Sequence, residues 1–303
     1  MGQRVTSVRE KAFERSVVRS FGGSRTAESA RGGNSRTVER FSPETRAAIA
    51  AAEAAGRILL RHFGRVRGIR LKGAKDPVTA ADTAAERNIR NSLARRFPHI
   101  GFLGEEGTTV DGPDGRWIVD PLDGTIAFIS GLPFFAVSIA LERRGRIEAG
   151  AILLPRLGEL FVAERGRGAW LNGQRIRVSR AARLADCVLS LWHDDTVWGD
   201  RRLRERIAGL ALEVRNVRIF GAGFSLAYVA AGRLDGYWEQ SAWPWDVAAG
   251  ALLVSEAGGR VTDGKGRPFD PEQPTILASN GRIHHFLIAA LNGHPVRAGS
   301  GRS

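Results

Sequence analysis

One segment gives the strongest structural signal in the chain: Trp117-Ile118-Val119-Asp120-Pro121-Leu122-Asp123-Gly124-Thr125. Its apolar first part predicts a strand over residues 117–120, and Pro121 disfavours a helical conformation at Asp120. Gly124 permits a tight bend directly after the second carboxylate. Asp120 and Asp123 can therefore converge on one point, with the Leu122 carbonyl between them and the Thr125 hydroxyl just beyond. All of these donors are oxygens, which suits a hard cation such as Mg2+.

The same segment also contains an ordinary turn sequence. Asp-Gly pairs occur five times in this chain, beginning at Asp111, Asp114, Asp123, Asp235 and Asp263. Only the pair at Asp123 combines a second aspartate, a proline and a hydroxyl residue behind a predicted strand. This segment alone therefore does not decide between a structural turn and a metal site. The acidic residues elsewhere in the chain favour the metal site.

Length and composition indicate a globular protein. The 303 residues, 43% of them hydrophobic and 25% charged, suffice for one large domain or two fused ones. The longest apolar stretches are too short to span a membrane, and the start lacks the apolar core of a secretory signal. Cys187 is the only cysteine, which excludes an intrachain disulfide and makes a reducing cytoplasm the expected compartment. His284 and His285 show no metal-binding spacing and are expected to be solvated.

The net charge of +13 raises the question of nucleic-acid binding. Residues 1–40 carry eight Arg and one Lys against four Glu, and the remaining positive charge is spread widely. The interleaved aromatic residues of a base-stacking surface are missing. A basic field that attracts anionic small substrates is therefore the simpler explanation, and RNA or DNA binding stays the alternative.

Four regions are predicted along the chain: a disordered basic arm (1–40), an N-terminal metal-binding α+β half (41–180), a C-terminal α/β half (181–295) and a disordered tail (296–303). Ser42-Pro43 predicts a helix start, and the first half is expected to hold helices at 46–63 and 83–97 and strands at 117–120, 135–142, 148–154 and 159–164. Consecutive hairpins there indicate a mainly antiparallel sheet. The second half is expected to alternate strands at 188–192, 214–219, 235–239 and 275–278 with helices at 201–210, 224–231 and 245–257.

Further acidic residues stand where predicted elements meet loops. Asp76 and Asp82 flank the loop before the second helix, Glu105 and Glu106 follow a short apolar run, and Asp246 stands at a helix start. Each has a plain structural explanation: Asp82 and Asp246 could be helix N-caps, and the glutamates could be solvated. Binding sites usually form at such junctions, so the whole set favours a shared site.

Four motifs closely resemble those of the inositol monophosphatase superfamily, the Mg2+-dependent, lithium-sensitive sugar and cyclitol phosphatases. They are the Asp76–Asp82 loop, Gly104-Glu105-Glu106, Asp120-Pro121-x-Asp123-Gly124-Thr125 and Trp245-Asp246-x-Ala248-Ala249-Gly250. The resemblance covers roughly residues 45–292. It implies an α/β fold of the α+β kind, a layered α/β/α/β/α sandwich of the sugar-phosphatase type.

The resemblance also implies a set of metal ligands. Glu105, Asp120 and the Leu122 carbonyl would hold a first, activating Mg2+. Asp120, Asp123 and Asp246 would hold a second ion, with Asp120 bridging the two. Two or three Mg2+ ions are expected in all, and several carboxylates packed this closely would repel one another strongly without them.

Other roles follow from the same resemblance. Asp76 would orient the nucleophilic water or a third ion, and Thr125 would assist at the first metal. Asp82 would support Thr125 from behind. The residues expected to act in catalysis are Asp76, Thr125 and Glu105, and those expected to contact substrate are Gly124, Thr125, Glu239 and Ala222.

The expected activity is that of a phosphomonoesterase that hydrolyses inositol-1-phosphate or a similar polyol phosphate with a metal-activated water. A small phosphorylated substrate, a homodimer and a cytoplasmic location are expected, without membrane association. The enzyme alternatives are histidinol-phosphate phosphatase, 3'(2'),5'-bisphosphate nucleotidase and fructose-1,6-bisphosphatase. The alternative of another class is an RNA-binding or regulatory protein on the same fold that uses residues 1–40.

Two departures from the family pattern bear on the substrate. Ala127 stands where many members have Asn, and the run from Ala127 to Pro133 resembles the histidinol-phosphate phosphatase branch. The segment 220–224 also departs from the usual pattern, which leaves the contact at Ala222 open.

Overall fold

The computed structural model describes residues 39–65, 69–72, 77–192, 197 and 199–294. The chain divides into two units, Met1–Arg40 and Phe41–Ser303, and every element below belongs to the second. The predicted C-terminal tail, nearly all of the basic arm, and Asp76 lie outside the described residues.

The described secondary structure alternates helices with two larger sheets and one small one. The helices are α3 (Pro43–His62), α4 (Ala80–Arg96), α5 (Thr125–Ile129), α7 (Arg201–Glu213), α8 (Ala222–Ala230), α9 (Pro244–Glu256), α10 (His284–Leu291) and the 3-10 turn η1 (Leu184–Asp186). The strands are β1 (Arg70–Leu71), β2 (Pro77–Val78), β3 (Gly101–Gly104), β4 (Thr109–Val110), β5 (Arg116–Asp123), β6 (Ala136–Arg143), β7 (Arg146–Leu154), β8 (Glu159–Glu164), β9 (Gly168–Leu171), β10 (Gln174–Ile176), β11 (Val188–Leu191), β12 (Asn216–Arg218), β13 (Gly236–Glu239), β14 (Arg260–Thr262) and β15 (Ile276–Ser279). No described helix is both long enough and apolar enough to cross a membrane.

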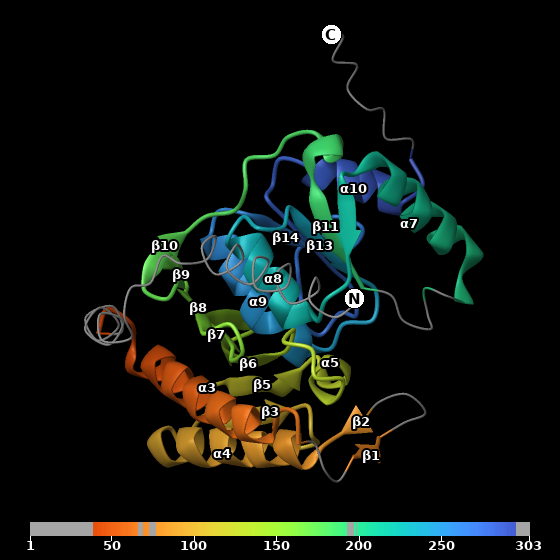
Figure 1. Ribbon diagram of the computed structural model, residues 1–303. Helices are drawn as coiled ribbons and strands as arrows, with labels where there is room; N and C mark the ends of the chain where they lie inside the picture. The colour runs from red at the N-terminus through yellow and green to blue at the C-terminus, as the bar shows by residue number, and fades with distance from the viewer. Residues whose placement is uncertain (1–38, 66–68, 73–76, 193–196, 198, 295–303) are drawn as a thin grey trace, which may run out of the picture. The chain divides into compact units, whose positions relative to one another are not determined.

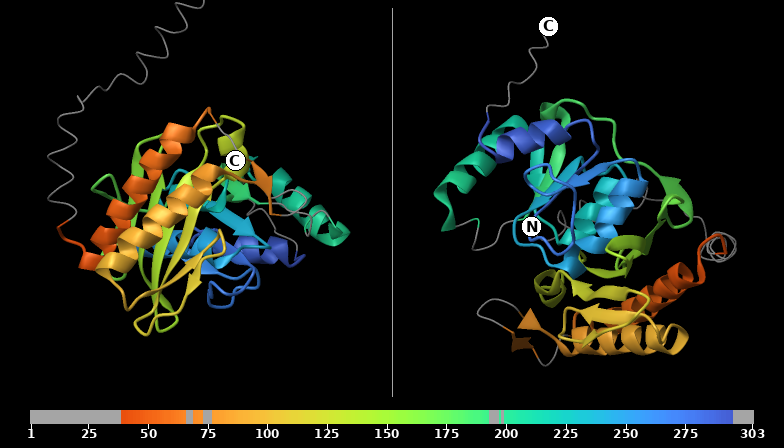
Figure 2. Two further views of the ribbon diagram at one scale, coloured as in Figure 1. Left: turned by 90° about the horizontal axis from the view of Figure 1, so that it is seen from below. Right: turned by 180° about the vertical axis from the view of Figure 1, so that it is seen from behind.

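Helix and sheet layers alternate within this unit (Figure 1). Helices α3 and α4 pack against one face of the large sheet at β5, β6 and β7, while α9 packs on its other face. Helices α8 and α9 also contact the five-stranded sheet at β13, β14 and β15. Helices α7 and α10 lie on the far side of that sheet, as the view from behind also shows (Figure 2). They share an apolar cluster with β11, β13 and β15. The predicted α/β/α/β/α order is confirmed.

The large sheet has the strand order β10-β9-β8-β7-β6-β5-β3-β4. Its neighbours are antiparallel except β3 and β5, which run parallel. The predicted antiparallel character is therefore confirmed. The smaller sheet, β12-β11-β13-β15-β14, is mixed, because β11 runs parallel to both of its neighbours.

The two predicted halves share one apolar core. Its buried members include Ile118 and Ile152 from the large sheet and Leu226, Val247 and Leu253 from α8 and α9. The large sheet ends before residue 180 and the smaller one begins after it, but helices of the second half cover the sheet of the first. The division at residue 180 stays a prediction.

The end of β5 differs from the predicted strand. The strand continues through Asp123 instead of ending at Asp120, and its register against β6 shifts between these two residues. Pro121 cannot donate to the ladder, so an irregularity at this point is expected. Both carboxylates thus project from an irregular strand end. The bend follows at Gly124, whose φ of 85° suits glycine.

The start of α4 also differs from the prediction. Its N-cap is Thr79, whose hydroxyl accepts from the Ala81 N–H at 3.1 Å, and Asp82 is the third helical residue. The Asp82 carboxylate accepts from the Thr79 N–H at 2.9 Å, which completes a capping box. Asp82 is fully buried, so one oxygen secures the helix while the other can face a neighbour. The start of α3 was predicted correctly: the Ser42 hydroxyl accepts from the Thr45 N–H at 3.2 Å.

The prediction of a solvated His284 is wrong. The side chain is 0% exposed, and its ring nitrogens lie 2.9 Å from the hydroxyls of Thr262 and Ser279. Two hydroxyl partners let a neutral imidazole replace its hydrogen bonds to water, while α10 buries the ring. His285, the next residue, is exposed as predicted. Burial, together with the charges of Arg260 and His285, lowers the pKa of His284 to about 4.

This pKa predicts a loss of stability in acid. In the unfolded chain the His284 imidazole binds a proton near pH 6.5, and in the folded chain only near pH 4. The contribution of neutral His284 to the free energy of unfolding is therefore fully present above pH 6.5 and is lost as the pH falls to 4. It amounts to about 2–3 kcal/mol. Denaturant unfolding between pH 4 and pH 7 should show a smaller pH dependence in His284→Gln than in the wild type. His99→Gln, which replaces an exposed histidine that does not act on His284, is the control. Identical curves for the wild type and His284→Gln would contradict the assignment.

Candidate active site

Four carboxylates predicted as metal ligands converge where β3, β5 and α9 end or begin. Strands β3 and β5 run side by side, and the Glu105 N–H donates to the Val119 carbonyl at 3.1 Å, which places Glu105 beside Asp120. Helix α9 packs on β5 and β6, and the Ser138 hydroxyl donates to the Trp245 carbonyl at 3.3 Å. Ser138 is the cross-strand partner of Asp120, so the first turn of α9 brings Asp246 to the same place.

The charges in this cluster are poorly compensated. Burial raises the pKa of Asp120 well above its usual value, and the charges of Glu105, Asp123 and Asp246 raise it further. Burial likewise raises the pKa of Asp123 to about 6. Burial and the charge of Glu239 raise the pKa of Asp246 well above its usual value. In the described part of the chain, no Lys or Arg forms an ion pair with any of the three aspartates.

The donor set fits hard divalent cations. It consists only of oxygens, and bound cations would offset the repulsion that raises these pKa values. Within the described residues, however, no three His, Cys, Asp or Glu side chains already enclose a metal position. Lys72 holds Glu105 at 2.9 Å, and Asp120 and Asp246 each accept a backbone N–H at 2.8 Å. Lys72 and backbone amides of this chain therefore orient these carboxylates.

Asp123 is held by the start of α8. Its carboxylate accepts from the Phe224 N–H at 3.3 Å, and hydrogen bonds from the amides of Gly223 and Ala222 oppose the burial that raises its pKa. Free amides at a helix N-terminus favour an anion in this position. A Cβ on Gly221 would lie 2.4 Å from Asp123 Oδ1, so the backbone approaches this carboxylate as closely as only glycine allows.

Thr125 begins α5 and contacts two of the predicted site residues. Its hydroxyl lies 3.2 Å from Asp82 Oδ1 and 3.0 Å from the Leu122 carbonyl oxygen. Asp82 therefore contacts Thr125, and its supporting role at the site stays a prediction. Gly124 is the N-cap of α5 and is half-buried together with Thr125.

The remaining residues predicted to act at the site differ in their burial and contacts. Glu239 is buried at the end of β13, accepts the Tyr237 hydroxyl at 2.6 Å and is close enough to Asp246 to affect its pKa. Ala222 is buried and turns its amide toward Asp123. Ala127 lies half-buried within α5, and Asp76 lies outside the described residues.

Two residues that contact the site loop were not predicted. Glu86, buried on α4, accepts from the Glu106 N–H at 2.9 Å and from the Thr108 hydroxyl at 2.6 Å. Lys72 lies 2.9 Å from Glu105 and 3.0 Å from Glu106. Glu86 follows Asp82 by four residues, so both lie on the same face of α4. A second acid on the face that carries Asp82 was the sequence pattern that could have indicated Glu86.

Glu86 is expected to be a positioning residue for Glu105. Glu86→Ala removes both acceptors and leaves the Glu106 N–H unsatisfied, which should cost about 1–3 kcal/mol of stability. It should also lower turnover by about tenfold to a hundredfold, because the loop that carries Glu105 loses its anchor. Kinetics and thermal unfolding check this expectation. Glu86→Gln, which keeps one carbonyl acceptor, should be milder in both, and an unchanged kcat in Glu86→Ala would contradict the role.

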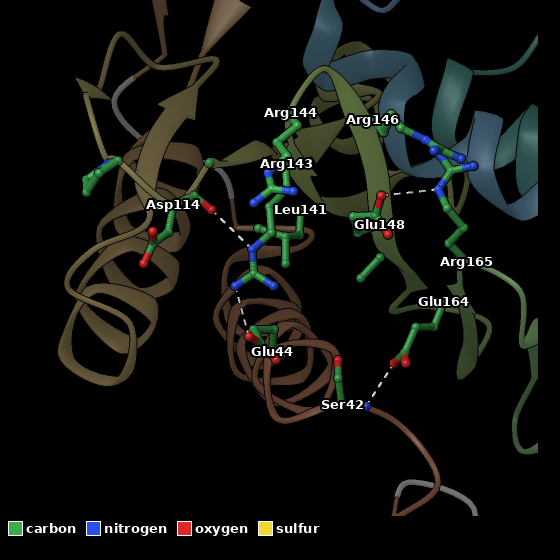
Figure 3. A pocket seen from close by; sticks show the side chains of 13 residues that line it. Ser42, Glu44, Asp114, Leu141, Arg143, Arg144, Arg146, Glu148, Glu164 and Arg165 are labelled. Atoms are coloured by element: carbon green, nitrogen blue, oxygen red, sulfur yellow. Dashed lines mark hydrogen bonds and ion pairs between the residues drawn. The ribbon is translucent and has the colours of Figure 1, made fainter.

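A separate cavity of about 670 Å3 lies at the other end of β6, where none of the predicted site residues reaches it (Figure 3). Two of the four arginines that line it are paired with acids: Arg143 with Glu44 at 2.9 Å, and Arg165 with Glu148 at 3.4 Å. The chemistry therefore belongs to the carboxylate cluster and not to this cavity.

Comparison with known proteins gives the family. A sequence model of the inositol monophosphatase family matches residues 41–295. The inositol-1-monophosphatase of Rhizobium meliloti is 45% identical over 239 residues, which are 77% of this chain and 90% of that protein. The Nus factor SuhB of Pseudomonas aeruginosa is 40% identical over 262 residues, which are 83% and 97%. The crystal structure of the suppressor protein SuhB from Bartonella henselae has a TM-score of 0.79 and 43% identity, and the match covers 86% of this chain and 100% of that one.

The chain belongs to the inositol monophosphatase family. Three predictions are thereby confirmed: membership of this family, its layered fold, and the enzyme class of a phosphoric monoester hydrolase. The family is metal-dependent and acts on small phosphorylated substrates. The carboxylate cluster lies in the part of the chain that matches the family.

Proposed function

We propose that this protein is a Mg2+-dependent phosphomonoesterase that hydrolyses inositol-1-phosphate or a similar polyol phosphate. The observation that carries the proposal is the convergence of Glu105, Asp120, Asp123 and Asp246, because only Glu105 has a cationic partner, Lys72, among the described residues. Relatives named inositol-1-monophosphatase, at up to 45% identity among those compared, support the substrate class.

The four carboxylates, with the Leu122 carbonyl, would hold two or three Mg2+ ions. Bound ions would lower the pKa of the attacking water and neutralise charge on the leaving oxygen. The chain itself would supply the positioning. Amides from the start of α8 hold Asp123, and the Asp82 carboxylate fixes the Thr125 hydroxyl beside the Leu122 carbonyl.

Other residues are proposed to bind substrate. Gly124 and Thr125 would present amides to the phosphate, and the buried Glu239 would accept a hydroxyl of the polyol. Ala222 is proposed as a further contact, and Asp76 as the residue that orients the attacking water. These roles, with the homodimer, the cytoplasmic location and the lithium sensitivity, stay predictions.

A substrate panel tests the proposal. Inositol-1-phosphate, histidinol phosphate, adenosine 3',5'-bisphosphate and fructose-1,6-bisphosphate are compared by phosphate release with and without Mg2+. The largest kcat/KM is expected for inositol-1-phosphate. Fructose-1,6-bisphosphate is a serious competitor, because a 40%-identical relative in Thermotoga maritima is named fructose-1,6-bisphosphatase/inositol-1-monophosphatase. Absence of Mg2+-dependent turnover with all four would refute the proposal.

A second candidate is a role with RNA or a regulatory partner. The relative in Pseudomonas aeruginosa is named a Nus factor, and this chain carries a net charge of +13 with a basic segment at residues 1–40. Deleting residues 1–40 separates the two candidates. Salt-sensitive RNA affinity that is lost in the deletion, with unchanged turnover, would support the second role.

A further inference from the structure

Trp243 is an exposed aromatic residue at the edge of the site. It is 61% exposed, and it is the only aromatic side chain among the exposed large hydrophobic residues of the described chain. Its indole stacks on Trp245, with ring centres 5.3 Å apart and planes inclined by only 5°. Trp245 packs against the apolar core, so the Trp243 ring stacks on an anchored partner while most of the residue stays exposed.

The backbone places Trp243 next to the groups proposed to bind substrate. The backbone N–H of Trp243 donates to Asp246 Oδ2 at 2.8 Å, and Pro244, the next residue, is buried at the start of α9. Glu239 lies four residues earlier and, after burial itself, is the largest influence on the pKa of Asp246. The backbone of Trp243 therefore lies beside Asp246, and Glu239 lies close enough to Asp246 for its charge to act on it.

Two further apolar residues next to predicted site residues are exposed. Ile126, directly after Thr125, is 61% exposed, and Ile219, two residues before Gly221, is 58% exposed. A strongly polar centre is thus flanked by apolar side chains. A surface of this kind suits a substrate whose phosphate is charged and whose alcohol portion has an apolar face.

We propose that the free face of the Trp243 indole stacks on the ring of the substrate's alcohol portion and so selects cyclic polyol phosphates over acyclic ones. The inference rests on the proposed function and names the substrate class within it. A cyclitol or sugar ring has hydroxyls around its edge and C–H groups on its faces. Glu239 takes an edge hydroxyl, and the aromatic face of Trp243 takes the C–H groups.

Steady-state kinetics with a cyclic and an acyclic substrate test the inference. In Trp243→Ala, KM for inositol-1-phosphate should rise about fivefold to tenfold, with little change in kcat. KM for glycerol-2-phosphate, which has no ring, should stay unchanged. Trp243→Phe should restore the KM for inositol-1-phosphate to within about twofold, because phenylalanine keeps an aromatic face. Leu212→Ala, which removes an 88%-exposed side chain from α7, is the control and should change neither KM.

An equal rise in both KM values, or no rise in either, would overturn the inference. Saturation-transfer NMR with myo-inositol, inorganic phosphate and Mg2+ supplies a readout that needs no turnover. Saturation of aromatic protein protons should reach the inositol C–H protons in the wild type and much less in Trp243→Ala, and absence of transfer in the wild type would also overturn it. If the wild type hydrolyses neither ester, the proposed function fails, and the NMR result still decides whether Trp243 contacts the ring.

Discussion

Asp120→Asn is expected to lower phosphatase activity on the order of a thousandfold or more while the fold stays intact. Asp120 is the predicted bridge between two metal ions, and a neutral amide cannot replace a bridging carboxylate. The substitution is structurally mild, because the side-chain oxygen of asparagine can still accept the Leu122 N–H that Asp120 Oδ1 accepts at 2.8 Å. Phosphate release at saturating Mg2+ measures the loss.

The same variant should be at least as stable as the wild type without metal. A carboxylate whose pKa is raised on folding contributes stability at low pH and loses it as the pH rises through the folded pKa. At neutral pH, the buried charge of Asp120 is therefore a cost that asparagine removes. Thermal unfolding without divalent ions should show an equal or higher Tm for Asp120→Asn. Added Mg2+ should then raise the Tm of the wild type more than that of the variant.

Asp114→Asn is the control, because it makes the same change of side chain at an aspartate that lies exposed in a turn away from the cluster. It should change neither activity nor the response of the Tm to Mg2+. Full activity in Asp120→Asn would contradict the bridging role. A large fall in the Tm without metal would show that Asp120 is needed for the fold instead.

Much of the site could be predicted because its acids occupy local motifs with fixed spacing. Asp120, Asp123 and Gly124 occur in a sequence that excludes a helix and demands a bend. The convergence of Glu105 and Asp246 on them is a tertiary fact. Their places at element–loop junctions only favoured a shared site, and the ligand set itself came from the family resemblance. Strand pairing of β3 with β5 and the packing of α9 on β5 supply the physical cause.

The errors arise where tertiary contacts decide an environment. His284 is buried because hydroxyls on β14 and β15 meet its ring, and no local pattern in the sequence announces those partners. The structural alternative for Asp82 and Asp246 was that each caps a helix as its N-cap residue. Each is instead the third residue of its helix, and its carboxylate accepts the backbone N–H of the N-cap residue. Boundaries of this kind depend on which of several neighbouring polar residues caps the helix, and composition alone does not decide it.

Gly221→Ala is expected to lower activity on the order of a hundredfold without unfolding the protein, because misplacing a catalytic group by about 1 Å has an effect of that size. The backbone at Gly221, with φ −55° and ψ 159°, is open to any residue, so alanine adds no backbone strain. The added Cβ would instead lie 2.4 Å from Asp123 Oδ1 and 2.7 Å from Oδ2. The Asp123 carboxylate must then move away from the α8 amides that hold it.

Gly221→Ser separates displacement of Asp123 from loss of a helix cap. Gly221 is the N-cap of α8, and serine is a better cap than alanine, so the serine variant should be the more stable of the two by about 0.5–1 kcal/mol. Both variants carry the Cβ, so both should lose activity to a similar extent in phosphate-release assays. Gly209→Ala on α7, where a Cβ meets nothing within 4 Å, is the control and should stay fully active. Near-normal activity in the serine variant would show that the close approach of Gly221 to Asp123 does not matter for catalysis.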